Sequence, residues 1–111
     1  MEYDREFLNG AVGVLILGLL TERDMYGYEM LQEAERRSAR TLQLKEGTLY
    51  PALRQMERAG LLKAKWRESA SGRARKYYGL TAKGRRQAES KRRQWAGIFT
   101  AIRAILGDVH A

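Results

Sequence analysis

The side chains in this chain that could do chemistry are mainly arginines and lysines, and few could act as nucleophiles or metal ligands. The 111 residues include no cysteine and a single histidine, His110. A disulfide framework, a thiolate zinc site, an iron–sulfur cluster and a cysteine nucleophile therefore lack their residues. One histidine is also too few for a histidine-rich metal site, and its place beside the C-terminus does not favour a Ser-His-Asp triad. We expect a binding protein rather than an enzyme, with no metal and no cofactor.

The positive charge is concentrated in the second part of the chain. Residues 1–41 carry 5 Lys/Arg and 8 Asp/Glu, whereas residues 42–111 carry 16 and 5, giving a net charge of +8 overall. Residues 63–93 alone hold 12 basic and 2 acidic side chains. Such asymmetry directs one side of the molecule toward a polyanion, either a nucleic acid or an anionic membrane surface. Basic helix faces that only keep the protein soluble are the simpler alternative.

One uninterrupted apolar segment, residues 11–20, could be mistaken for a membrane span. A spanning helix needs about 20 apolar residues, and the mostly acidic flanks of this segment are unlike the basic start of a signal peptide. The polar residues 83–93 also lack the apolar face with which a basic helix lies on a membrane. We expect a cytoplasmic protein without a membrane partner, in which residues 11–20 form a helix buried on most sides.

Hydrophobic side chains at intervals of three and four residues predict three helices in the first half of the chain. They cover residues 4–20, about 25–38 and about 47–59. Thr48 as the N-cap of the third helix would place Pro51 in its first turn, where the missing N–H of proline is not needed.

After Gly60, which is expected to end the third helix, the hydrophobic period changes to two. Apolar and basic side chains alternate over residues 62–67, and residues 76–80 read as a returning strand. Trp66 falls on the apolar face of this hairpin, so we expect it in the core. Thr81 then caps a last helix.

This order of elements is that of a winged helix-turn-helix, a mainly α-helical fold with a small β-hairpin. We expect residues 1–81 to form this winged helix-turn-helix as a DNA-binding domain. Residues 82–111 would add a C-terminal dimerisation helix within one compact unit. In such a fold the third helix presents its polar face to the major groove, about 12 Å wide, and the hairpin brings cations to the sugar–phosphate backbone.

Three segments resemble the PadR family of bacterial transcriptional regulators: YGYEM at 26–30, EGTLYPALRQMERAGLL at 46–62 and GRARKYYGLTAKG at 72–84. The GTLYPAL block is the most specific, because a generic winged helix does not require Tyr-Pro there. The single terminal helix resembles the short subfamily. The resemblance implies a homodimeric repressor whose third helix and wing contact double-stranded operator DNA, in the bacterial cytoplasm and at the nucleoid when bound.

The resemblance also implies which residues contact DNA. They lie on the third helix and its leading edge, and on the wing: Lys45, Glu46, Thr48, Tyr50, Arg54, Arg73, Arg75 and Lys76. For Tyr50 the alternative is packing, and for Arg54 it is a solvated helix arginine. For the three wing cations we expect phosphate contact, partly because no carboxylate lies nearby in the sequence to pair with them.

Three positions depart from the family pattern. Lys45 stands where a small capping residue is more typical, Ala74 replaces a frequent proline at the wing tip, and Gly79 replaces a polar or basic residue. We expect a less defined helix start, a looser wing tip and a weaker second wing strand.

The last helix carries apolar residues at heptad-like spacing, and these predict a dimer interface. Together with two residues of the first helix, the expected interface consists of Leu15, Leu19, Trp95, Ile98, Phe99, Ile102 and Leu106. The alternative is that the last helix folds back on the first helix of its own chain. In a dimer, Trp95 and Phe99 could line a cavity for a small planar aromatic effector, or they could simply pack.

The function predicted from these patterns is sequence-specific DNA binding by a regulator, a homodimeric repressor released by a small hydrophobic or aromatic effector. A winged-helix module that binds protein or RNA partners without operator recognition is the alternative.

Overall fold

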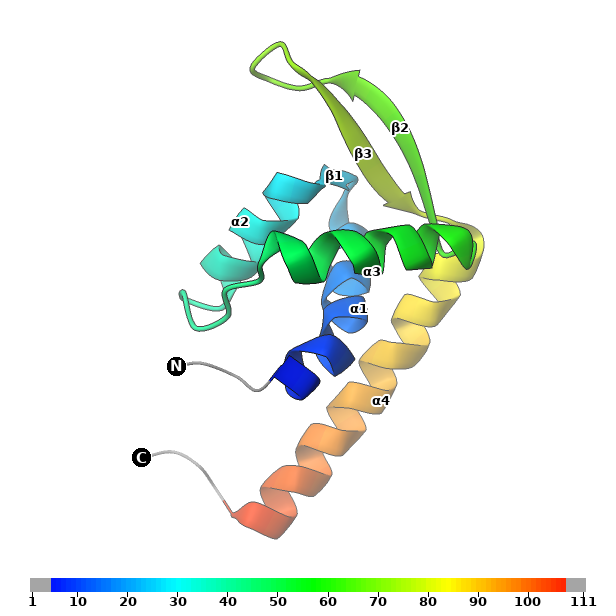
Figure 1. Ribbon diagram of the computed structural model, residues 1–111. Helices are drawn as coiled ribbons and strands as arrows, with labels where there is room; N and C mark the ends of the chain where they lie inside the picture. The colour runs from blue at the N-terminus through cyan, green and yellow to red at the C-terminus, as the bar shows by residue number, and fades with distance from the viewer. Residues whose placement is uncertain (1–4, 108–111) are drawn as a thin grey trace.

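The computed structural model describes the backbone of residues 5–107 and the side chains of residues 10–107. His110 lies outside these residues. The fold is mainly helical with a small amount of β-structure, as predicted, and its antiparallel sheet has three strands (Figure 1). Its elements are α1 (Arg5–Glu22), β1 (Met25–Tyr26), α2 (Gly27–Arg37), α3 (Glu46–Arg58), β2 (Leu62–Glu68), β3 (Ala74–Leu80) and α4 (Ala82–Leu106).

α1 forms the centre of the hydrophobic core. Its side chains Ile16 and Leu20 are almost completely buried, and the helix packs against α2, α3, α4 and β3. A helix that is apolar on nearly every side is stable only when neighbours cover most of its surface. Among the described helices, none is long and apolar enough to cross a membrane.

α3 begins earlier than predicted. Its N-cap is Lys45, whose carbonyl accepts hydrogen bonds from the N–H groups of Thr48 and Leu49, both at 3.0 Å. The prediction of Thr48 as N-cap was therefore wrong, and Pro51 lies inside the helix. Because the Pro51 side chain is exposed, the helix gives up one hydrogen bond there without having to fit the ring into the core.

The face and the end of α3 agree with the predicted pattern. Leu49, Leu53 and Met56 are buried one turn apart and anchor the helix on the core. Gly60 has a φ of +79°, and the N–H of Leu61 donates to the carbonyl of Met56 at 3.0 Å. This is a helix end that favours glycine, because only glycine adopts positive φ without a steric cost.

The sheet contains a strand that sequence reasoning missed. β1 pairs with β3, with Met25 opposite Tyr78 and Tyr26 opposite Tyr77, so the strand order is β1-β3-β2. The second helix therefore begins at Gly27 instead of near residue 25. A two-residue strand has no periodicity of its own and exists only through its partner.

β2 and β3 form a long hairpin, the wing, which projects beyond the helices (Figure 1). Because it extends past the body, the apolar face of β2 has no core to cover at its far end. Leu62 is buried, Ala64 is half-buried, and Trp66 is 70% exposed. The prediction of Trp66 as a core residue was wrong for this reason.

α4 starts against the body and ends away from it (Figure 1). The hydroxyl of Thr81 accepts a hydrogen bond from the N–H of Gly84 at 3.0 Å, which confirms the predicted cap. Gly84 lies directly on the carbonyl of Leu61 and leaves no room for a Cβ atom. The helix packs on α1 of its own chain, whereas its last turns leave Ile105 81% and Leu106 73% exposed.

Candidate nucleic-acid interface

α3 presents one side to solvent and carries cations there. Arg54, Gln55 and Arg58 are exposed, opposite the buried residues of the helix, and Lys45 and Glu46 are exposed at its start. Within the described part of the chain, no carboxylate pairs with Arg54 or Arg58. Thr48 is half-buried in the first turn. The polar face of α3 is therefore open and positively charged near its middle and end.

Tyr50 lies at the edge of this face and is held by α2. Its side chain is half-buried and packs against Gly27 so closely that a Cβ at position 27 would lie 2.7 Å from the Tyr50 ring. Burial, and then the nearby Glu46, raise the pKa of Tyr50. The phenol therefore keeps its proton at neutral pH and can donate a hydrogen bond to a phosphate oxygen.

The wing cations occupy different environments. Arg73 is exposed at the tip. Arg75 is half-buried, its guanidinium lies 5.1 Å from the centre of the Tyr26 ring, and its Nε atom is buried without a hydrogen-bond partner among the described residues. The Lys76 ammonium pairs with the carboxylate of Glu57 of α3 at 3.4 Å, a partner 19 residues away that the sequence neighbours of Lys76 did not reveal. The phenol of Tyr78 and, after it, Glu57 raise the pKa of Lys76.

The sequence placed three further cations on a basic face of the wing, but they were not among the residues predicted to contact DNA. Lys63, Lys65 and Arg67 alternate along β2 and are exposed, and the Arg67 guanidinium lies 3.9 Å from the centre of the Tyr77 ring. Their alternation with apolar residues predicted this basic face, which is the outer face of the wing, and the same signal could have added them to the DNA-contact residues.

The structure shows how the chain accommodates two of the departures from the family pattern. The side chain of Lys45 makes no capping hydrogen bond, although its carbonyl does start α3. At Gly79 the carboxylate of Asp24 lies so close that a Cβ atom would collide with it, while β3 still pairs with Lys63 of β2 at this point. Gly79 therefore lets the loop before β1 approach the sheet.

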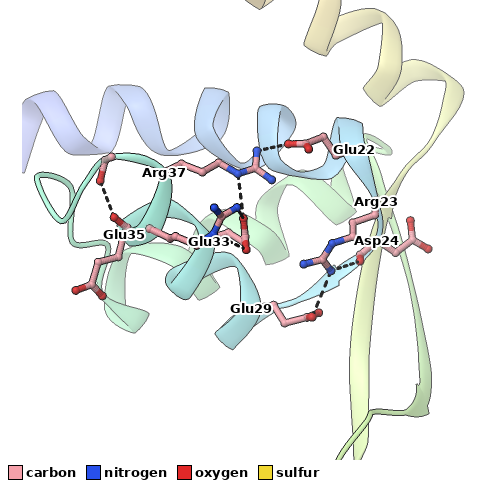
Figure 2. A network of polar contacts seen from close by, with 9 residues as sticks. Glu22, Arg23, Asp24, Glu29, Glu33, Glu35 and Arg37 are labelled. Carbon is pink, nitrogen blue, oxygen red and sulfur yellow. Dashed lines mark hydrogen bonds and ion pairs between the residues drawn. The ribbon is translucent and has the colours of Figure 1, made fainter.

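Carboxylates neutralise the arginines on the side of α1 and α2 (Figure 2). Arg37 pairs with both Glu22 and Glu33, and Arg36 pairs with Glu33 at 2.7 Å. Hydrogen bonding from Arg36, followed by Arg37, lowers the pKa of Glu33 to about 2. The described residues offer no such partners to the cations of α3 and of the outer wing, namely Arg54, Arg58, Lys63, Lys65 and Arg67. These cations therefore dominate the electrostatic field on their side of the molecule.

α3 and the wing lie in the part of the chain that matches a known protein family. Residues 16–90, which include α2, α3 and the whole wing, match the model of the transcriptional regulator PadR-like family. This chain belongs to the PadR-like family. It is therefore a transcriptional regulator, and regulators of this family bind DNA and typically form dimers.

Several bacterial relatives of this PadR-like chain cover nearly its whole length. It is 37% identical over 103 residues to the transcriptional regulator Rv3488 of Mycobacterium tuberculosis, covering 93% of this chain and 90% of the relative. A PadR family transcription regulator from Clostridium difficile is 37% identical, with a TM-score of 0.75 over 88% of this chain and 100% of its own. A PadR-like regulator from Bacillus cereus is 28% identical, with a TM-score of 0.81 over 92% and 97%.

The residues of the predicted dimer interface divide into two groups in this PadR-like fold. Leu19 is 6% exposed and belongs to the core of its own chain, and Leu15 is half-buried beside that core. The remaining residues lie on α4 and, apart from half-buried Trp95, are exposed: Trp95, Ile98, Phe99, Ile102 and Leu106.

Trp95 and Phe99 lie next to each other, with ring centres 5.6 Å apart. They line two hollows between α4 and α1, with volumes of about 540 and 360 Å³. Val14 lines both hollows, while small residues such as Gly18 and Ala11 each open one of them. The hollows are mainly apolar with aromatic walls, and the larger one is also lined by Arg85, Glu89 and Arg92.

Proposed function

We propose that this chain is a sequence-specific DNA-binding repressor, with α3 entering the major groove and the wing contacting the sugar–phosphate backbone. The observation that carries the proposal is the group of cations on α3 and the outer wing that have no carboxylate partner in the described part of the chain. Arg54 is the residue we assign to base-edge or phosphate contact, because its planar guanidinium matches both. Bound to its operator, the protein would lie in the cytoplasm at the nucleoid.

We propose further that the protein acts as a homodimer. The support is the apolar surface on the last turns of α4, since soluble monomers rarely expose contiguous apolar patches of large side chains. Two copies joined through this surface would present two α3 helices to one face of DNA. Their half-sites would then lie about one helical turn apart, ~34 Å, or a multiple of it.

The effector is the third part of the proposal. We infer that a small planar aromatic molecule binds beside Trp95 and Phe99, because their rings border apolar hollows of sufficient size for such a molecule. A ligand here would touch both α1 and α4 and could change how two subunits meet. Quenching of tryptophan fluorescence by a panel of planar aromatics tests this point, and no quenching across the panel would leave Trp95 as a packing residue.

A gel-shift titration with the DNA upstream of the protein's own gene tests DNA binding. If a dimer neutralises about 8 phosphates, log affinity falls against log salt with a slope near −7. Arg54→Ala should weaken binding about tenfold or more. The matched control is Arg36→Ala, which removes the same charge from an arginine already paired with Glu33. A slope near zero, or equal affinity for random DNA, would contradict the proposal and favour a module for protein or RNA partners.

A further inference from the structure

An aromatic groove separates the wing from the starts of α2 and α3. Its volume is about 350 Å³, and the residues that define it are Tyr26, Tyr28, Tyr50, Trp66, Arg75 and Lys76. None of the described residues that line this groove is acidic. It is separate from the hollows beside Trp95, which lie between α1 and α4.

Trp66 is the side chain in this groove whose presence is not explained by packing in the hydrophobic core. Its cross-strand partner is Lys76, so both side chains leave the hairpin on the face that also buries Leu62. The Trp66 side chain nevertheless remains 70% exposed, and Tyr28 across the groove is 52% exposed. Two large aromatic side chains thus face water on the two sides of one hollow, where they contribute little to the core.

The groove combines positive charge with aromatic rings, so it suits a negatively charged ligand that also has an apolar surface. The Arg75 guanidinium lies 5.1 Å from the centre of the Tyr26 ring. The Lys76 ammonium, which also pairs with Glu57, lies 5.3 Å from the centre of the Tyr78 ring. Both cations therefore stand beside aromatic rings. The phenol of Tyr50 keeps its proton, since its pKa is raised. A sugar–phosphate strand offers the matching features, because each phosphate carries one negative charge and each deoxyribose has an apolar surface.

We propose that the aromatic groove holds one backbone strand of the operator, with the Trp66 indole packed on its deoxyriboses and Lys76 and Tyr50 on its phosphates. Trp66 is then a DNA-contact residue, and the strand is held from the side of the wing as well as from α2. This inference rests on the DNA-binding function proposed above. It assigns to Trp66 and Tyr28 a role that is independent of the cations on the outer wing.

Fluorescence provides the first test, because Trp66 and Trp95 are the two tryptophans of the chain. A saturating amount of the upstream duplex should quench the emission of the wild-type protein. The Trp66→Phe variant, which leaves Trp95 as its tryptophan, should show almost no quenching in the same titration. Equal quenching in both proteins, or unchanged wild-type emission while a gel shift reports binding, overturns the inference. If the wild-type protein fails to shift the duplex at all, the proposed function itself is wrong.

Affinity provides the second test. Trp66→Ala should weaken binding of the duplex about tenfold, as expected when one aromatic contact to nucleic acid is lost, and Trp66→Phe should recover most of it. The slope against salt should stay the same, because no charge is removed. Lys65→Ala, the neighbouring residue whose side chain leaves the other face of β2, is the control and should make the slope less steep.

Two results would point to another occupant and overturn the inference. Unchanged affinity of Trp66→Ala for the duplex would leave the indole without a DNA contact. A shift of Trp66→Ala from dimer to monomer in sedimentation would make the groove an interface between two copies of the chain. Thermal unfolding should be nearly the same in wild type and variant, since an indole this exposed adds little to the core.

Discussion

The Nζ atom of Lys76 in β3 lies 3.4 Å from the Oε1 atom of Glu57 in α3, and this ion pair joins the wing to the helix beside it. Both side chains are partly exposed, so the pair contributes little to the free energy of unfolding, of the order of 0–1 kcal/mol. Its effect on binding is larger, because Glu57 places a negative charge beside a cation that we assign to DNA. The chain thus holds Lys76 in position at the expense of part of its attraction for phosphate.

Glu57→Gln tests this balance. We expect the variant to bind the upstream duplex about two- to tenfold more tightly at low salt, with a slope against salt steeper by about 1, because Lys76 becomes free to neutralise a phosphate. Gel shifts at several salt concentrations measure both quantities. An unchanged slope would mean that Lys76 does not reach a phosphate.

Gly27→Ala should destabilise the protein even though alanine is the better helix former. A Cβ at this position would lie 2.7 Å from the Tyr50 ring, and a ring anchored beside the core cannot move away as easily as a flexible side chain. We expect a loss of about 1–3 kcal/mol in the free energy of unfolding, measured by urea denaturation.

The matched control for this prediction is Gly47→Ala in α3, where nothing lies within 4 Å of the added Cβ. That variant should gain about 0.5–1 kcal/mol from helix propensity. If both variants gain stability, Tyr50 moves freely and is not fixed by α2. The DNA contact assigned to Tyr50 would then lack its positioning.

Glu33 should make the free energy of unfolding depend on pH in the acid range. Its pKa falls to about 2 in the folded protein because Arg36 and Arg37 donate hydrogen bonds to it, and it returns toward 4.5 on unfolding. The unfolded state therefore binds more protons between these values. The stabilisation is complete above about pH 4.5 and is lost as the pH falls toward 2.

We expect Glu33→Gln to be less stable than wild type at pH 7 and the difference to shrink between pH 5 and pH 2. Denaturant unfolding of both proteins at several pH values measures it. Glu68→Gln, at the end of the wing strand β2, is the control that keeps the network of Figure 2 intact. A constant difference between wild type and Glu33→Gln across this range would contradict the ion-pair network.

The sequence predicted those features that depend on neighbouring residues. The period of Leu49, Leu53 and Met56 gave the buried face of α3, and Gly60 gave its end, because both follow from the local geometry of a helix. Alternation in β2 likewise showed two faces of the wing. It could not show where the body beneath the wing ends, and so Trp66 was assigned to the core.

Contacts between residues far apart in the sequence could not be predicted from local sequence patterns. β1 exists because Met25 and Tyr26 meet β3 some 50 residues later, and Lys76 meets Glu57 across 19 residues. The aromatic groove is a further case, since Tyr28, Tyr50 and Trp66 come from three elements. Each of these needs the tertiary fold before its partners are known.

The last prediction concerns the exposed apolar surface of α4. Ile102→Glu places a charge in this surface and should shift the protein from dimer to monomer at micromolar concentration, because burying an unpaired charge is costly. Ile102 is partly exposed within one chain, so each subunit should stay folded, as circular dichroism would verify. Ala104→Glu adds the same charge about half a turn away on the helix and should remain dimeric. Sedimentation velocity distinguishes these outcomes, and a wild-type protein that sediments as a folded monomer would remove the basis for two coupled DNA-binding helices.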